Sequence, residues 1–199
     1  MCGEKQVFFS LNHKTDALLY RELVEWLSEN HVAINPWTTA DFETEGNFNS
    51  EKERQSRLID QVVNSSYAVV IVGEEAIDPE SIDIQALNAA AWMKRPTIAL
   101  NINQLRDIDR DHFPQLIMDQ LVLHIPMEGQ IVKYALESWK DESFKVRTMG
   151  QTGPVHYAND IYDLIDRGSS PVHRFERHPE EAGSAASDSP SPWTQPAAA

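Results

Sequence analysis

The chain has few residues suited to disulfides or metal sites. Cys2 is its only cysteine, and its seven histidines are scattered along the sequence. One thiol cannot close a disulfide within the chain, and no cluster of His and Cys has the spacing of a known metal centre. We therefore predict no metal ligands and no required cofactor.

Long apolar runs and basic clusters are also missing. No stretch approaches the roughly 20 apolar residues that span a bilayer, and the N-terminus lacks the basic region and apolar core of a signal peptide. With 17 Lys and Arg against 31 Asp and Glu, the formal net charge is -14, which opposes binding to nucleic-acid phosphates. These absences predict a cytoplasmic protein that binds neither membranes nor nucleic acids.

Two common nucleotide-binding motifs are absent as well. The sequence contains no GxxxxGK[ST] loop and no GxGxxG after a strand, so neither a P-loop nucleotidase nor a Rossmann dehydrogenase is favoured. What remains is a chain of 199 residues, 41% of them hydrophobic, which is enough for one domain with a substantial core.

Two short apolar segments give the main indication of fold. Residues 7–10 and 67–73 are bounded by polar residues, too short for typical helices and too continuous for strands with one wet face. Segments of this kind are typical of buried parallel strands, which occur in α/β sheets. Helical spacing and capping residues predict helices over residues 15–30, 50–64, 78–93, 130–139 and 157–165.

Further strands are predicted at residues 32–34, 97–102 and 121–125, and the polar stretch 38–49 is predicted to be a loop. Strands that alternate with helices imply right-handed crossovers. The sequence thus predicts a flavodoxin-like, three-layer α/β fold with a parallel sheet of about five strands.

The composition changes near the end of the chain. More than half of residues 168–199 are Gly, Ala, Ser or Pro, too little apolar surface to offset the entropy of ordering. We predict one domain over residues 1–167 and a disordered tail over 168–199. Phe175 and Trp193 are alternative docking anchors within a tail interpreted as inert.

Ligands of doubly wound sheets gather at the carboxyl ends of the strands, which directs attention to two connections. Ser10, Asn12, His13 and Lys14 follow the first strand, and Gly73 ends the third. These hydroxyl, amide, imidazole and ammonium groups suit ribose or phosphate oxygens, although an ordinary polar turn before a helix has the same composition.

Trp37 follows the second predicted strand and has two interpretations. Its indole can stack on the base or ring of a ligand. A tryptophan beside a sheet is more often part of the core, and we favour that reading.

In order and spacing, these segments resemble a known family. The first strand reads Val7-Phe8-Phe9-Ser10, the turn 64–66 (Asn-Ser-Ser) leads into the buried strand that ends at Gly73, and the fourth strand ends Leu100-Asn101-Ile102-Asn103. Over roughly residues 7–103 the chain resembles TIR-like domains, in particular those of bacterial Thoeris antiphage-defence proteins.

The resemblance implies a site for NAD or a related nucleotide, with NAD as a substrate. In catalytic members, a glutamate in the helix after the third strand assists cleavage to nicotinamide and a linear or cyclic ADP-ribose signal. The family's WxxxE pattern falls here on Ser81 and Gln85, so Gln85 stands at the catalytic position. Glu74 and Glu80 lie where the third strand connects to this helix and are the alternative carboxylates.

Three functions follow as hypotheses. The first is a TIR-like signalling protein that binds a nucleotide and, if active, acts as an NAD glycohydrolase or ADP-ribose cyclase for a partner effector. The second is a catalytically degenerate TIR-like interaction module that self-associates through its long loop and neighbouring helices. The third is a nucleoside deoxyribosyltransferase-like enzyme, which shares the flavodoxin-like layout.

Overall fold

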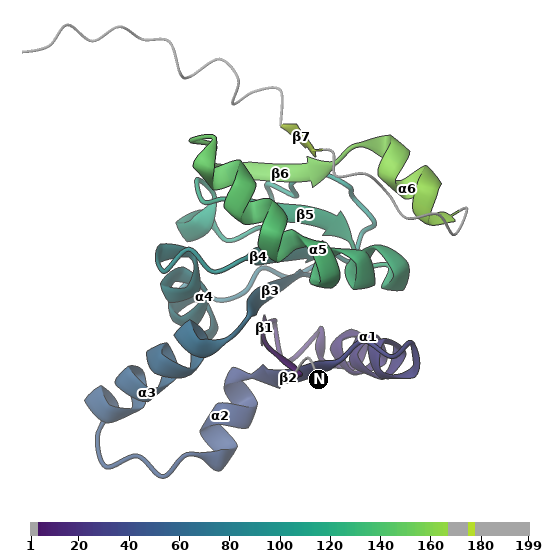
Figure 1. Cartoon of the computed structure of the whole chain (residues 1–199). Coiled ribbons are helices and arrows are strands. Elements are labelled where there is room, and N and C mark those ends of the chain that lie inside the picture. Colours follow the sequence, from purple (N-terminus) through teal and green to yellow (C-terminus); the bar gives the residue numbers. More distant parts are fainter. Residues whose placement is uncertain (1–3, 167–174, 178–199) are drawn as a thin grey trace, which may run out of the picture.

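A single twisted sheet organises the protein, whose computed structural model describes residues 4–166 and 175–177. The order of the strands across the sheet is β2-β1-β3-β4-β5-β6-β7 (Figure 1). The strands are β1 (Lys5–Ser10), β2 (Ile34–Thr38), β3 (Tyr67–Val72), β4 (Thr97–Asn101), β5 (Val122–Pro126), β6 (Pro154–Tyr157) and β7 (Phe175–Arg177). Pairing is parallel from β2 to β6, and β7 runs antiparallel to β6.

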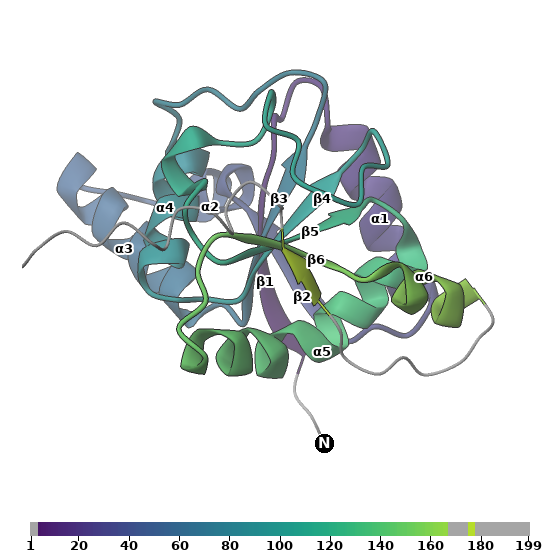
Figure 2. The same cartoon turned by 90° about the horizontal axis from the view of Figure 1, so that it is seen from above.

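Helices cover both faces of this sheet, which confirms the predicted three-layer α/β fold. They are α1 (Ala17–Glu29), α2 (Thr39–Glu45), α3 (Glu51–Asn64), α4 (Ile82–Trp92), α5 (Gly129–Thr148) and α6 (Asn159–Asp166), with a 3₁₀ turn η1 (Gln115–Ile117). Figure 2 shows α1 and α5 on one side of the sheet and α3 and α4 on the other. Each face therefore has its own hydrophobic cluster.

The central strands are apolar because both of their faces are covered. All six residues of β3 are buried. Its odd-numbered residues belong to the cluster shared with α1 and α5, and its even-numbered residues to the cluster shared with α3 and α4. Burying a Val, Leu or Ile side chain stabilises a fold by about 1.5–3 kcal/mol. The continuous apolar run of β3 therefore contributes to two hydrophobic clusters, one on each face of the sheet.

The arrangement of β1 and β3 is the feature that positions a site. The two strands pair in parallel, with Ser10 opposite Val70, while β2 lies on the other side of β1. After β1, the chain adds β2 on one side of that strand and then adds β3 and all later strands on its other side. This is the switch point at which doubly wound sheets hold their ligands.

The second strand was predicted wrongly at residues 32–34. It runs from Ile34 to Thr38 and includes Pro36, which lacks the N–H that a central strand would need. Because β2 is an edge strand paired only with β1, the proline is tolerated there.

The predicted loop over residues 38–49 contains the short helix α2. A capping box starts it: the Thr38 side chain accepts from the backbone N–H of Asp41, and the Asp41 carboxylate accepts from the backbone N–H of Thr38. This local signal was missed because only Thr39 and Phe42 of the helix are buried, too few to show a helical period.

Other boundaries also moved. The helix predicted from Asp78 begins at Ile82, with Ser81 as its N-cap, because the Asp78 side chain and carbonyl form a separate turn with the amides of Glu80 and Ser81. The helix predicted over 130–139 continues to Thr148. The predicted helix 157–165 is divided between the end of β6 and α6.

The sheet is larger than the five or so strands expected. β6 was not predicted, and its last residue, Tyr157, was placed at the start of a helix. β7 lies inside the segment 168–199 that was predicted to be disordered. Phe175 begins β7, whereas Trp193 and most of that segment lie outside the described residues. Among the residues that the structure describes, none of the helices has the length and hydrophobicity to span a bilayer.

Candidate functional site

Gly73 directly follows β3, and its Cα packs against the carboxylate of Asp16 in the connection that follows β1. A Cβ atom added to Gly73 would lie 2.6 Å from an Asp16 carboxylate oxygen, so only glycine allows this approach. The Asp16 carboxylate accepts hydrogen bonds from the backbone N–H of Asn12 (3.3 Å) and the Thr15 hydroxyl (2.9 Å). Gly73 is therefore needed for packing against Asp16 and does not open toward a ligand.

Burial raises the pKa of the Asp16 carboxyl above its ordinary value, and the charges of Glu75 and Glu74 add to the effect. The hydrogen bonds from Thr15 and Asn12 act in the opposite direction without reversing it. Asp16 is only 2% exposed. We assign Asp16 a structural role, because its carboxylate holds the β1–α1 connection through hydrogen bonds from Asn12 and Thr15.

A polar cluster joins three elements at the same edge of the sheet. The Thr39 hydroxyl at the start of α2 donates to Oδ2 of Asp83 in the first turn of α4, over 2.8 Å. Nε2 of His13, which follows β1, lies 3.2 Å from the Thr39 hydroxyl and 3.7 Å from Oδ1 of Asp83. Oδ1 of Asp83 is buried and has no hydrogen-bond partner.

Helix capping places the members of this polar cluster (His13, Thr39 and Asp83). The Ser81 side chain caps α4 by accepting from the backbone N–H of Ile84, which puts Asp83 in the first turn, where a negative charge is favoured. Thr39 is fixed by the capping box before α2. The side chain of His13 is 36% exposed, against 7% for Asp83, so the cluster reaches the surface through His13.

The pKa of His13 is raised above its ordinary value of 6.5. The nearby Asp83 carboxylate, 3.7 Å from Nε2, is the largest cause, partial burial opposes it, and the charge of Asp41 reinforces it. The protonated imidazole is consequently favoured, and this edge presents a positive group in a protein of strongly negative net charge.

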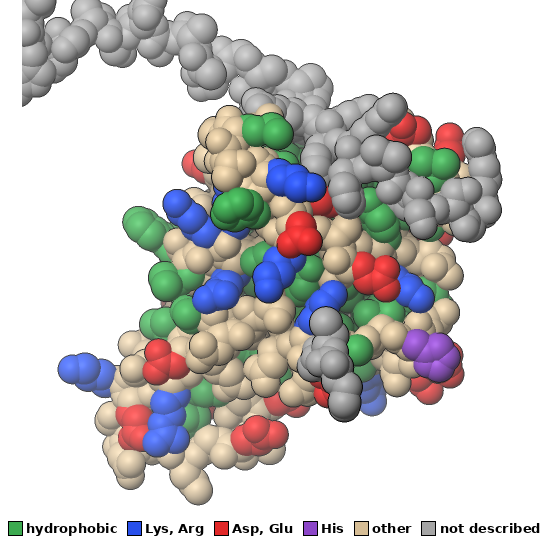
Figure 3. All heavy atoms as spheres, viewed as in Figure 1, with side chains coloured by type: hydrophobic (Ala, Val, Ile, Leu, Met, Phe, Trp, Pro, Cys, Tyr) green, Lys and Arg blue, Asp and Glu red, His purple; other side chains and the backbone are tan. Residues whose placement is uncertain are grey.

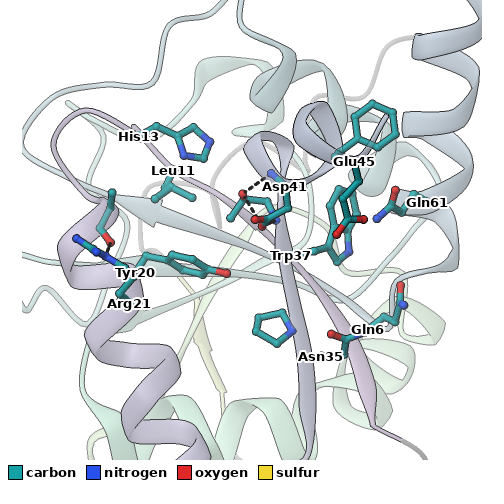
Figure 4. Close-up of a pocket in the computed structure, with 14 residues that line it drawn as sticks. Gln6, Leu11, His13, Tyr20, Arg21, Asn35, Trp37, Asp41, Glu45 and Gln61 are labelled. Carbon is teal, nitrogen blue, oxygen red and sulfur yellow. Dashed lines mark hydrogen bonds between the residues drawn. The ribbon is translucent and has the colours of Figure 1, made fainter. Parts of the chain in front are cut away.

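His13 lines the first pocket, a cavity of about 590 Å³ that runs along the open edge of β2 between α1, α2 and α3 (Figure 4). In Figure 4 the Tyr20 hydroxyl points from α1 toward α2, which carries Asp41. Burial and the Asp41 charge raise the pKa of Tyr20 to about 12, so it stays a hydrogen-bond donor. The lining consists of Gln6, Leu11, His13, Ala17, Tyr20, Arg21, Asn35, Pro36, Trp37, Thr38, Asp41, Phe42, Glu45 and Gln61.

Trp37 contributes a wall of the first pocket and is also core, as the sequence favoured. It is 6% exposed, its ring lies 4.7 Å from that of Phe8, and its indole N–H donates to the Ser65 hydroxyl over 3.0 Å. Stacking on a ligand would require the indole to leave the core and to break its hydrogen bond with Ser65.

Three other residues predicted to bind a nucleotide, Ser10, Asn12 and Lys14, do not line the first pocket. Ser10 is fully buried at the end of β1, and its hydroxyl has no hydrogen-bond partner. Asn12 accepts from the backbone N–H of Lys14 and so builds the turn, while Lys14 is exposed. Of the six predicted binding residues, His13 and Trp37 line the first pocket.

The three predicted catalytic residues do not join the polar cluster. Glu74 and Glu80 are exposed in the connection before α4. Gln85 is exposed on α4, and its side-chain amide donates to the carbonyl of Glu80 over 3.4 Å. The buried acid on this helix is Asp83, two residues earlier and therefore on a different side of the helix.

Sequence reasoning missed Asp83, Thr39, Tyr20 and Asp41. Asp83 stands between Ile82 and Ile84, and the first helical turn was misplaced by the Asp78-Pro79 pair. Within residues 4–166 and 175–177, no group of three or more His, Cys, Asp or Glu is placed to hold a metal ion.

Comparisons with known proteins give little beyond this geometry. No protein-family model matches the chain, and no curated protein matches it. The chain is similar to a solved structure described as "Crystal structure of conserved protein from Enterococcus faecalis V583". The identity is 16% over 83% of this chain and 99% of that chain, with a TM-score of 0.40.

Proposed function

We propose that this chain is a TIR-like signalling protein of bacterial antiphage defence that binds NAD or a related nucleotide in the first pocket, in the cytoplasm. One observation carries the proposal. A buried carboxylate, Asp83, lies 3.7 Å from the imidazole of His13, which follows β1 and lines the first pocket at the β2 edge. The end of β1 belongs to the switch point between β2 and β3, and doubly wound folds bind nucleotides at such a point.

The chemistry of the first pocket suits the parts of a nucleotide. His13 and Arg21 are the cationic groups of its lining and match phosphate oxygens. Asn35 and Gln61 offer amides, which can donate to or accept from the base and the ribose hydroxyls. The volume of about 590 Å³ falls within the range of small-molecule sites.

Cleavage of NAD would need a carboxylate near the ribose carbon that becomes positive as nicotinamide leaves. Gln85 offers none, and Asp83 lies behind His13. Of the two carboxylates that line the first pocket, Asp41 is engaged by the Thr38 cap, so we assign this role to Glu45. The carbon–nitrogen bond would break with its electron pair on nicotinamide, and water would add its oxygen to carbon and release a proton.

The test combines binding and turnover. NAD is titrated into the protein by calorimetry, and nicotinamide release is followed by chromatography. His13→Gln should weaken NAD binding by roughly 10- to 150-fold, because a hydrogen bond to a charged group contributes about 1.5–3 kcal/mol. Gln85→Ala, on the exposed side of α4, is the matched control and should bind NAD as the wild type does. Glu45→Gln should keep binding and stop any nicotinamide release.

Absence of NAD binding at millimolar concentration would overturn the proposal, and so would equal binding by the His13 variant. Binding without nicotinamide release would mark a degenerate member that uses the nucleotide only as a ligand. A gain of release in Gln85→Glu would return the catalytic position to Gln85 and remove Glu45 from it.

A second function, a protein-interaction module, is favoured by the end of α4. Trp92 is 75% exposed and Met93 is 55% exposed. Figure 3 shows apolar side chains on the surface along the edge where α4 lies. Large exposed apolar residues mark contact surfaces when they cluster. Concentration-dependent association that Trp92→Glu abolishes, without any NAD binding, would support the module instead.

A further inference from the structure

A second pocket, with a volume of about 520 Å³, lies between the β3–α4 connection and the segment that leads from β4 to η1. Its walls are mainly apolar. Ile77, Pro79 and Ile84 form one side, and Phe113, Pro114 and Leu116 form the other. Proline rings have no side-chain rotamers to lose, so two of these walls are rigid before any ligand arrives. A preformed apolar cavity of this size is typical of a small-molecule site.

The polar side chains of the second pocket are those of Asp111, His112 and Gln115, and the imidazole of His112 is the one fixed by a buried carboxylate. Nδ1 of His112 lies 2.9 Å from Oδ2 of Asp109, whose side chain is 7% exposed. The same oxygen accepts from the amide of Asn103 over 2.8 Å, and Oδ1 accepts from the backbone N–H groups of Asp111 and His112. Asp109 therefore fixes the ring of His112 in one orientation.

The charge on Asp109 sets the tautomer of His112. Burial opposes ionisation of Asp109, but the hydrogen bond and charge of His112 and the backbone N–H groups outweigh it, so the pKa of Asp109 lies below its usual range. An ionised carboxylate can only accept, which places the imidazole proton on Nδ1. In the neutral ring Nε2 is then an acceptor, and the side chain of His112 is 36% exposed at the pocket.

We propose that the second pocket binds a small, uncharged heteroaromatic molecule whose N–H donates to Nε2 of His112 while its rings contact the proline and phenylalanine walls. The carboxylate of Asp111 at the lining disfavours anions. No Lys or Arg is among the residues that line the second pocket, whereas Arg21 and His13 line the first pocket. The site is independent of the proposed nucleotide function.

Indole and benzofuran make a matched pair of probes, because they have nearly the same shape and only indole carries an N–H donor. Because a protonated imidazole has no acceptor, the titration is run at pH 8 and followed by amide chemical shifts. Both probes should shift the amide resonances of the second-pocket residues. Indole should bind about fivefold more tightly than benzofuran, because it makes one more net hydrogen bond. His112→Leu should bind both probes equally.

Two further variants keep the test decisive. His112→Gln offers an amide oxygen as acceptor and should recover part of the preference for indole that His112→Leu loses. Gln85 lines neither pocket, so Gln85→Ala is the control and should keep the wild-type preference for indole. NAD affinity should not change in His112→Leu, which separates this site from the first pocket. No saturable shift up to the solubility of indole, equal binding of both probes by the wild type, or shifts confined to the first pocket would overturn the proposal.

Discussion

The two pockets each place a histidine against a carboxylate that is 7% exposed, yet the two pairs are built differently. His13 and Asp83 come from separate elements, 70 residues apart in the sequence, and Thr39 of a third element joins them. His112 and Asp109 are three residues apart in one connection. The first pair depends on the tertiary fold, and the second depends on a local turn.

The pairs also differ in how far their carboxylates are satisfied. Each oxygen of Asp109 accepts two hydrogen bonds. Oδ2 of Asp83 accepts one, and Oδ1 has none, with His13 only at ion-pair distance. A buried acceptor without a donor costs free energy, so it interacts favourably with a nearby cation. The comparison marks Asp109 as a positioning group and Asp83 as a group held ready for a charged neighbour.

Replacing one wall of each pocket should give the largest contrast. Trp37→Ala should lower the free energy of unfolding by about 3–5 kcal/mol, because the change empties a core site. Leu116→Ala should cost roughly 0.5 kcal/mol or less, because that side chain is 57% exposed. Urea unfolding followed by circular dichroism measures both. A Leu116 variant as unstable as the Trp37 variant would show that the Leu116 side chain belongs to the core.

Changing each carboxylate to an amide should give the next effect. In Asp109→Asn an NH₂ group must face two of the four donors, which should cost about 1–3 kcal/mol of unfolding free energy. In Asp83→Asn the amide oxygen can still accept from Thr39 while the NH₂ group faces His13, so the loss should be less than about 1 kcal/mol.

The same urea unfolding experiment, run on both variants at one pH, provides the measurement. Asp111→Asn, at an exposed position beside the second pair, is the control and should change stability by at most about 0.5 kcal/mol. If Asp83→Asn were the more destabilising of the two buried changes, the assignment of Asp83 as the unsaturated carboxylate would be wrong.

The sheet was predictable from sequence where its strands are buried on both faces. The apolar run of β3 identified a central strand without any knowledge of its partners, because two covered faces leave no polar alternation. β2 and β7 lie at the edges, where each strand pairs on one side only and a proline or a polar residue is tolerated. These edge strands, and the four-residue β6 beside β7, therefore carried too weak a pattern to be placed.

The candidate site was predictable as a location and only partly as a set of residues. His13 was found because it follows a recognisable strand. Asp83 was not, because the start of α4 was placed at Asp78 when the cap is Ser81, and burial in a helix changes with every residue. Thr39 enters the polar cluster through contacts across 26 and 44 residues, which no local pattern records.

The smallest expected effect is a dependence of stability on pH that belongs to His13 alone. Because its pKa is raised in the folded protein, its contribution is fully present below the ordinary value of 6.5 and is lost as pH rises through the folded pKa. The difference in unfolding free energy between wild type and His13→Gln should thus shrink from pH 6 upward. Its size should stay below about 1 kcal/mol, since the side chain is 36% exposed and solvent screens the pair.

Lys14→Gln removes an exposed positive charge from the neighbouring residue and is the matched control. Its difference from the wild type should stay constant between pH 6 and 8. Combining His13→Gln with Asp83→Asn should abolish the pH-dependent part, because the carboxylate that raises the pKa of His13 is then gone. A pH-dependent difference that survives in the Asp83→Asn background would separate the two residues and leave His13 as an isolated surface histidine.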